Sequence, residues 1–190
     1  MSRNVTTRIL ISIPCKNEEE NIEAVLSSLR GDMIGDAEID TLVVDDGSSD
    51  RTVSLAVKNK VSFVITKNRY PGLPSSFSIA SGFAVANGYD ILVNTDGDNQ
   101  YFQEKIPELV RPIMENEAEL VIGDRLVSKL KHFSLAKKML QKLGSKTVSF
   151  VCGQKIDDAA SGFRACSVDL LARLNVTTTF SYAMETLIQS

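Results

Sequence analysis

The strongest constraint on the fold is a regular alternation of short β-rich runs with amphipathic helical patterns along the first 125 residues. Such alternation predicts parallel strands joined by right-handed helical crossovers, which is a Rossmann-like, open, mostly parallel α/β sheet flanked by helices. The predicted strands cover 8–14, 39–46, 62–66, 90–96 and 119–123. The predicted helices cover 18–29, a segment capped by Asp50, a segment within 75–87, and 103–116.

Length and composition restrict the class of protein. A chain of 190 residues has room for one compact domain with a substantial core. A formal net charge of −3 argues against nucleic-acid binding, which needs a basic surface. The three cysteines, Cys15, Cys152 and Cys166, form no CxxC pair, so they predict free or buried thiols rather than disulfides or a zinc site. Free thiols indicate a reducing compartment, and hence a cytoplasmic location.

The second part of the chain, 126–190, has a different pattern. Residues 126–150 form a lysine-rich amphipathic stretch that predicts one or two helices. Its basic face is interpreted either as solvated surface, which is the commoner case, or as a surface that rests on anionic lipid or a phosphorylated acceptor. The last residues, FSYAMETLIQS, have the pattern of an uncapped amphipathic helix. We therefore expect a native chain that continues past Ser190, and an exposed apolar face that favours association into an oligomer.

Four polar clusters follow predicted strands. They are Pro14-Cys15-Lys16-Asn17-Glu18, Asp45-Asp46-Gly47-Ser48-Ser49-Asp50, Asp96-Gly97-Asp98-Asn99-Gln100 and Gly123-Asp124-Arg125. Ligands of open parallel sheets bind beyond the carboxyl ends of the strands, so these clusters are expected to converge on one site. The sequence contains neither GxGxxG nor GxxxxGK[ST], so a backbone phosphate cradle of either kind is not indicated.

The third cluster, NTDGDNQ, has two interpretations. As a plain turn it would place acids and glycine where turns usually have them. As a metal site, Asp96 and Asp98 would turn onto one cation, because Gly97 lets the chain bend sharply between them. Oxygen ligands of this kind suit Mg²⁺ or Mn²⁺, which proteins commonly hold with one or two carboxylates and substrate phosphates.

The second cluster has two interpretations as well. Asp46 either begins an Asx turn before the next helix or accepts hydrogen bonds from the edge of a nucleobase. Asp45 precedes it on the strand and is expected to face the opposite way, in a structural role.

Five segments in order, IPCKNEEENI, VVDDGSSDRT, VNTDGDNQY, VIGDR and DAASGFRA, strongly resemble the family 2 glycosyltransferases with a GT-A fold. The resemblance is closest to the dolichol-phosphate mannose synthase-like branch and its prokaryotic relatives, and it extends from Ile9 to the last residues. It implies a single domain over 1–190, with a nucleotide-sugar half at 1–125 and an acceptor half at 126–190. It also implies an inverting, metal-dependent transfer from a nucleotide-diphosphate sugar. The acceptor would be a polyprenyl phosphate or a growing glycan, and the enzyme would lie at the cytoplasmic face of a membrane.

The resemblance assigns roles on the donor side. The nucleoside pocket would be lined by Pro14, Asn17 and Glu18, and the base would be read by Asp46. The metal site would comprise Asp96, Asp98 and Gln100, with Gly97 close to the nucleotide sugar. Arg125 would face the diphosphate. A metal ion on Asp98 would stabilise the leaving nucleoside diphosphate as a Lewis acid, with Arg125 as a second positive charge.

The acceptor side is assigned by the segment around SGFR. Asp158 falls at an acidic position near the acceptor and is the candidate general base if the acceptor is a hydroxyl group; an ionised lipid phosphate needs little or no base. Arg164 would meet phosphate or pair with an acid. The chain departs from the family where Pro74 and Ala80 stand, and Pro74 predicts a helix that starts later than usual, which bears on the choice of sugar.

Three other functions compete with this interpretation. A sugar nucleotidyltransferase would need a glycine- and arginine-rich first loop, whereas PCKNEEEN is acidic. A receiver-like signalling module would carry its acid pair after the first strand, whereas here the pairs follow the second and fourth. A non-catalytic nucleotide-sugar-binding domain stays open as the third alternative.

Overall fold

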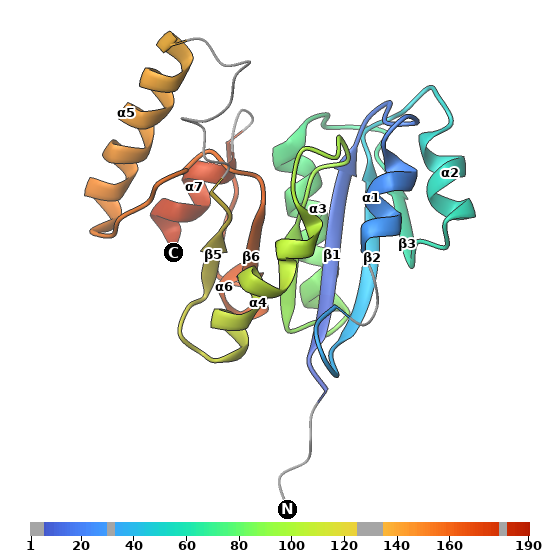
Figure 1. Cartoon of the computed structure of the whole chain (residues 1–190), viewed down its shortest axis with the longest axis horizontal. Coiled ribbons are helices and arrows are strands. Elements are labelled where there is room, and N and C mark those ends of the chain that lie inside the picture. The colour runs from blue at the N-terminus through green and yellow to red at the C-terminus, as the bar shows by residue number, and fades with distance from the viewer. Residues whose placement is uncertain (1–5, 30–32, 125–134, 179–181) are drawn as a thin grey trace, which may run out of the picture.

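The computed structural model describes residues 6–29, 33–124, 135–178 and 182–190. In this part of the chain one sheet has the strand order β3-β2-β1-β4-β6-β5 (Figure 1). The strands are β1 Arg8–Cys15, β2 Glu38–Asp45, β3 Phe63–Thr66, β4 Ile91–Asn94, β5 Leu120–Ile122 and β6 Arg164–Ser167. The helices are α1 Ile22–Ser28, α2 Thr52–Lys58, α3 Leu73–Ala86, the 3-10 turn η1 Gln103–Lys105, α4 Ile106–Met114, α5 Leu135–Cys152, α6 Val168–Leu171 and α7 Tyr182–Gln189.

Strand β1 lies at the centre of the sheet because its side chains are apolar on both faces. It pairs in parallel with β2 and with β4, and β2 pairs in parallel with β3. Successive side chains of a strand point to opposite faces, so Ile9, Ile11 and Ile13 enter one core cluster and Leu10 enters another. An apolar strand buried on both faces is typical of parallel sheets covered by helices.

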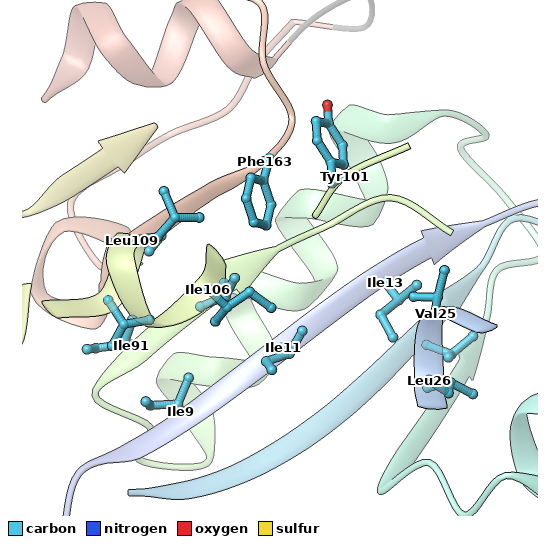
Figure 2. Close-up of a cluster of buried hydrophobic side chains, with 14 of the residues drawn as sticks. Ile9, Ile11, Ile13, Val25, Leu26, Ile91, Tyr101, Ile106, Leu109 and Phe163 are labelled. Carbon is cyan, nitrogen blue, oxygen red and sulfur yellow. The ribbon is translucent and has the colours of Figure 1, made fainter. Parts of the chain in front are cut away.

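Two helical layers cover the sheet. Helices α1, α2 and α4 contribute to the core cluster on one face, which is drawn in Figure 2. Helices α3, α6 and α7 pack on the other face, where Phe77 stacks on Tyr182 with ring centroids 4.3 Å apart. Helix α5 lies outside these layers and contacts α7 through Val148 and Leu187. The predicted α/β class and mostly parallel sheet are confirmed.

Strand β6 is the main feature that the sequence analysis did not contain. It enters between β4 and β5 and runs antiparallel to both. Its sequence, RACS, has no run of β-branched residues, and its burial comes from its neighbours in the sheet. Since β6 is antiparallel, it begins at the edge where the parallel strands end, and this brings the SGFR segment to the predicted site.

Two predicted helix starts are wrong. Helix α3 begins at Leu73, not later, because Pro74 lies in the first turn, where the missing N–H has no intrahelical acceptor to lose. Helix α1 begins at Ile22 rather than at residue 18, and the residues before it form a turn in which the N–H groups of Asn21 and Ile22 both donate to the Glu18 carbonyl oxygen. The final helix is confirmed as α7. Among the described residues, no helix is both long and apolar enough to cross a bilayer.

Candidate active site

A hollow of about 280 Å³ opens at the carboxyl edge of the parallel strands. Four segments form its walls: the end of β1, the residue after β2, the first turn of α3 and the turn after β4. Its lining residues are Pro14, Cys15, Lys16, Glu18, Asp46, Gly72, Leu73, Ser76, Asp96, Gly97 and Asp98. The expected convergence is therefore confirmed for the first three polar clusters; in the fourth, Asp124 lines a different hollow and Arg125 lies outside the described residues.

Of the described residues that were predicted on the donor side, all but two line this hollow. The hollow includes Pro14, Glu18, Asp46, Asp96, Gly97 and Asp98. Asn17 and Gln100 are absent from its lining, although Asn17 lies between two residues that line it. Gln100 is exposed, and its backbone N–H donates to the Asp98 carboxylate over 3.1 Å.

Asn17 joins two loops instead of facing the hollow. Its side-chain oxygen accepts from the backbone N–H of Ser49 at 2.8 Å, and its own N–H donates to Ser48 Oγ at 2.9 Å. Its φ of 55° is a left-handed conformation that asparagine tolerates better than most residues. Asn17 thereby holds the loop after β1 against the loop after β2, which carries Asp46.

The same two loops are joined at further points. The backbone N–H of Glu18 donates to Thr52 Oγ1, and that of Glu19 donates to a carboxylate oxygen of Asp50. Asp50 also accepts from the backbone N–H of Thr52, but the N-cap of α2 is Arg51, so the predicted cap at Asp50 is wrong by one residue. Asp45 is buried and accepts from the N–H of Ser48, which is the structural role expected for it. The loops after β1 and β2, which form two walls of the hollow, are thus joined by hydrogen bonds within the protein.

Asp46 is held by a buried lysine. Its Oδ1 lies 3.0 Å from Lys67 Nζ, and its Oδ2 accepts from the backbone N–H of Gly72 at 2.8 Å. Burial raises the pKa of Asp46, but the hydrogen bonds from Gly72 and Lys67 outweigh it, so the net pKa lies below the ordinary value. Asp46 is therefore a carboxylate at neutral pH, able to accept further hydrogen bonds from a ligand in the hollow.

Gly97 allows the turn after β4 to approach β1. A Cβ at this position would lie 3.4 Å from the carbonyl oxygen of Pro14 and 3.5 Å from Glu18 Cγ. The flanking acids Asp96 and Asp98 consequently line one hollow within a few residues of the β1 end. The residue that follows, Asn99, has a φ of 57°, which completes the sharp turn.

The donor set fits a hard divalent cation. Asp96 and Asp98 offer carboxylate oxygens to the same hollow, and no other type of ligand is needed for Mg²⁺ or Mn²⁺. Within the described residues, no group of three or more His, Cys, Asp or Glu side chains is arranged to hold a metal by itself. The protein would thus contribute the two carboxylates, and a bound diphosphate would contribute the remaining oxygens.

The SGFR segment lies beside Asp96. A Cβ on Gly162 would be 3.4 Å from both carboxylate oxygens of Asp96. Two side chains hold this segment: Asn94 Nδ2 donates to the Gly162 carbonyl oxygen at 3.0 Å, and the Gly162 N–H donates to Tyr101 Oη at 3.2 Å. The backbone at 162 thus lies within contact distance of the Asp96 carboxylate.

Arg164 lies beneath the site rather than in the hollow, which corrects its predicted contact with substrate. Its guanidinium is fully buried and donates to the Ser161 carbonyl oxygen, to the Ala183 carbonyl oxygen at 3.1 Å and to Thr186 Oγ1 at 2.8 Å. It also stacks against Tyr182, with its Cζ 5.2 Å from the ring centroid. Arg164 therefore joins the SGFR segment to α7.

Asp158 lines a different hollow. This second hollow, of about 540 Å³, lies between β5, the end of α5 and α7, and Asp158 and Asp124 both contribute to it. The structure does not place Asp158 in the hollow with Asp98. Arg125, predicted to face the diphosphate, lies outside the described residues, as does most of the stretch between β5 and α5.

The sequence analysis gave no role to the lining residues Gly72, Leu73 and Ser76, nor to Lys67, which binds Asp46 behind the hollow. Lys67 directly follows β3, and its side chain is 2% exposed although it is charged. A lysine at the end of a predicted strand, just before the turn-forming residues Tyr70 to Gly72, was the available signal. Its contact with Asp46 was not deducible, because it depends on the path of the following loop.

Comparison with known proteins identifies the family to which the chain belongs. The model of "Glycosyl transferase family 2" matches residues 10–174, which is most of the chain. The chain belongs to glycosyltransferase family 2. This confirms the resemblance found in the sequence.

Relatives in family 2 act on lipid-linked acceptors according to their names. The undecaprenyl-phosphate mannosyltransferase of Micrococcus luteus is 30% identical over 175 residues, which is 89% of this chain and 70% of that protein. The dolichol-phosphate mannosyltransferase of Pyrococcus furiosus is 31% identical over 191 residues, covering 96% of this chain and 53% of that protein. The polyprenol monophosphomannose synthase of Mycolicibacterium smegmatis is 26% identical, with 66% of its length covered.

Solved structures confirm the GT-A fold. Glucosyl-3-phosphoglycerate synthase of Mycobacterium tuberculosis has a TM-score of 0.66 at 25% identity, with 88% of this chain and 60% of that chain covered. The same enzyme in complex with Mn²⁺ and uridine-diphosphate-glucose has a TM-score of 0.64 at 26% identity, covering 88% and 58%. The chain thus spans little more than half of these solved structures.

Proposed function

We propose that this domain transfers a sugar from a nucleotide-diphosphate sugar to a polyprenyl phosphate, with inversion at the anomeric carbon. The observation that carries the proposal is the placement of Asp46, Asp96 and Asp98 in one hollow at the carboxyl edge of the sheet. The named activities of the Micrococcus and Pyrococcus relatives support the lipid-phosphate acceptor, and the complexes of the mycobacterial synthase support the donor class.

Each acid of the hollow has a separate task in this proposal. Asp46 accepts hydrogen bonds from the base, and the loop that contains Pro14 and Glu18 forms the nucleoside wall. Asp96 and Asp98 bind Mg²⁺ or Mn²⁺, which when bound offsets the charge of the diphosphate and acts as a Lewis acid on the leaving group. Arg125 adds a further positive charge at the diphosphate.

The bond changes balance without a proton acceptor. A phosphate oxygen of the lipid attacks the anomeric carbon from the face opposite the diphosphate. The bond from that carbon to the diphosphate oxygen breaks, and its electron pair leaves with the nucleoside diphosphate. The attacking oxygen is already ionised, so no general base is required. We accordingly assign Asp158 no proton transfer in this reaction, in agreement with its place in the second hollow.

Helix α5 is proposed as the surface that rests on the membrane carrying the acceptor. Its sequence contains four lysines and no acid. Met139, Leu143 and Phe150 recur at helical spacing and are 74%, 62% and 89% exposed. An apolar stripe on a basic helix suits the interface of an anionic bilayer. The free cysteines support the cytoplasmic face, where thiols stay reduced.

Two measurements test the proposal. Melting temperatures with UDP-, GDP- and dTDP-sugars, each with and without Mn²⁺, should rise for one donor class and only with metal. That donor and a polyprenyl phosphate should then yield a glycosylated lipid. Donor binding without transfer to any acceptor would instead favour the non-catalytic binding domain.

The membrane contact has its own test. Phe150→Ser on α5 should reduce the fraction of protein that sediments with anionic vesicles. Val57→Ser is the control, because Val57 is also an exposed apolar residue but lies on α2, and this variant should sediment as the wild type does. Equal binding of both variants and wild type would remove α5 from the membrane surface.

A further inference from the structure

Lys67 uses all of its hydrogen-bonding capacity inside the protein. Its ammonium group lies 3.0 Å from Asp46 Oδ1, 2.9 Å from the Gly72 carbonyl oxygen and 2.8 Å from Ser75 Oγ. An ammonium group has three N–H donors, and these three acceptors occupy them. Lys67 therefore has no donor left for a ligand, although it lies directly behind the wall of the hollow.

Lys67, Gly72 and Asp46 bind one another in a closed ring at the N-terminal end of α3. Gly72 accepts from Lys67 through its carbonyl oxygen and donates its N–H to Asp46 at 2.8 Å, while Asp46 binds Lys67. Gly72 has a φ of 104°, which only glycine adopts without strain. Gly72 thus presents both backbone groups to the same ion pair.

This ring joins two walls of the nucleotide hollow. Asp46 lines the hollow from the end of β2, and Gly72, Leu73 and Ser76 line it from the first turn of α3. Lys67 is anchored in the sheet, because its N–H donates to the Asp45 carbonyl oxygen at 2.8 Å. Two kinds of contact thus set the spacing of the two walls: the direct hydrogen bond between Gly72 and Asp46, and the buried ammonium group that binds both.

We propose that Lys67 is a positioning residue, which holds Asp46 and the first turn of α3 at the spacing that a nucleotide requires. This inference rests on the proposed function, which identifies the ligand as a nucleotide. It assigns to Lys67 an effect on donor affinity and not on the chemical step, since the three donors of the ammonium group are occupied within the protein and Lys67 does not line the hollow.

The first test needs no nucleotide. In Lys67→Met, amide hydrogen exchange of residues 70–77 in the free protein should become at least about tenfold faster, because Gly72 and Asp46 lose their shared partner. Lys58→Met is the matched control: it removes the same charge from an exposed lysine that lies 3.8 Å from Glu23. Unchanged exchange at 70–77 in Lys67→Met would overturn the proposal, whether or not the protein binds nucleotides.

The second test uses donor kinetics in the wild type and the variants. Lys67→Met should raise the donor KM by about tenfold to a hundredfold and change kcat by less than about threefold. Asp46→Asn combined with Lys67→Met should lose little more than the worse single variant, because the two residues act as one unit. A fall in kcat alone, or additive losses, would contradict a positioning role.

A milder variant covers the case in which Lys67→Met does not fold. Ser75→Ala removes one acceptor and leaves the lysine in place. It should raise the donor KM a fewfold and speed exchange at 70–77, and wild-type values for both would again overturn the proposal. A wild-type protein that binds no nucleotide diphosphate refutes the proposed function, whereas the exchange result still decides the role of Lys67.

Discussion

A Cβ atom placed on Gly97 would lie 3.0 Å from the Cβ of Cys15. The turn after β4 and the end of β1 are thus in close contact, and an added methyl group would push them apart by a few tenths of an ångström. Both residues line the donor hollow. The two carboxylates on either side of Gly97 owe their place to this contact.

Gly97→Ala should therefore displace the turn. We expect about tenfold weaker binding of nucleotide and metal, and a loss of about 1–2 kcal/mol in the free energy of unfolding, because the added methyl group overpacks the contact. Gly82→Ala is the control, since a Cβ there meets nothing within 4 Å and Gly82 lies inside α3. That variant should gain about 0.5–1 kcal/mol and bind normally. Calorimetric titration measures binding and urea unfolding measures stability in both variants. Normal binding by Gly97→Ala would show that Cys15 and the turn can move apart without displacing the carboxylates.

Asp98→Asn should abolish metal-dependent binding of the donor. The diphosphate would meet Glu18, Asp46 and Asp96 without a cation to offset the repulsion. The melting temperature without ligand should hold or rise, because one of several converging negative charges is removed. Asp36→Asn, which makes the same change in an exposed turn, serves as the control. Titration of Mn²⁺ with nucleotide as tight as in the wild type would reduce the segment to a plain turn.

Arg164→Met should destabilise the protein by about 3 kcal/mol. The substitution leaves the Ser161 and Ala183 carbonyl oxygens and Thr186 Oγ1 without their buried donor. Arg173→Met is the control, because the ion pair of Arg173 with Glu119 is largely exposed and worth at most about 1 kcal/mol. Urea unfolding compares the two variants. Equal losses would mean that the network beneath the site contributes little.

The free energy of unfolding should fall as the pH rises above about 9. Burial raises the pKa of the Cys166 thiol from its ordinary value of 9.0 to about 12. Between these values the thiol is ionised in the unfolded chain and neutral in the folded one, so its contribution is complete below pH 9 and is lost toward pH 12. The slope per thiol is about 1.4 kcal/mol per pH unit.

Urea midpoints at pH 8 and pH 10.5 measure this loss. Cys166→Ala should make the decrease smaller. Leu92→Val is the control, because Leu92 is the neighbour of Cys166 on β4 and has no proton to lose. It should lower stability equally at both pH values. An unchanged pH dependence in Cys166→Ala would assign the decrease to other groups.

The strands that could be predicted from the sequence are those with a recognisable local pattern. Strands β1 to β4 are apolar runs bounded by turn residues, and the polar clusters after β1, β2 and β4 met at one edge for the same reason. Strand β6 was missed because its four residues gain their strand structure only from two neighbours distant in the sequence. Local patterns do not record that kind of stabilisation.

The site was predicted at the level of residue types and less well at the level of contacts. Asp46, Asp96 and Asp98 were placed correctly in one hollow, because strand ends decide their position. Asn17 and Arg164 were assigned to substrate, whereas the structure shows them joining segments of the protein. The sequence shows that a residue near a site is polar, but it does not show whether that residue contacts a ligand or a neighbouring loop.

The antiparallel strand β6 also has a consequence for folding. Asn94 and Gly162 are 68 positions apart in the chain, so their hydrogen bond closes a long loop. The pairing of β4 with β1 closes a longer loop still, whereas β1 with β2 and β2 with β3 pair across much shorter ones. Closing long loops costs more chain entropy and slows pairing. We therefore expect the part of the sheet from β1 to β3 to form first and β4 and β6 to join it later. The wall that contains Asp46 would then exist in a folding intermediate before Asp96 and Gly162 meet beside it.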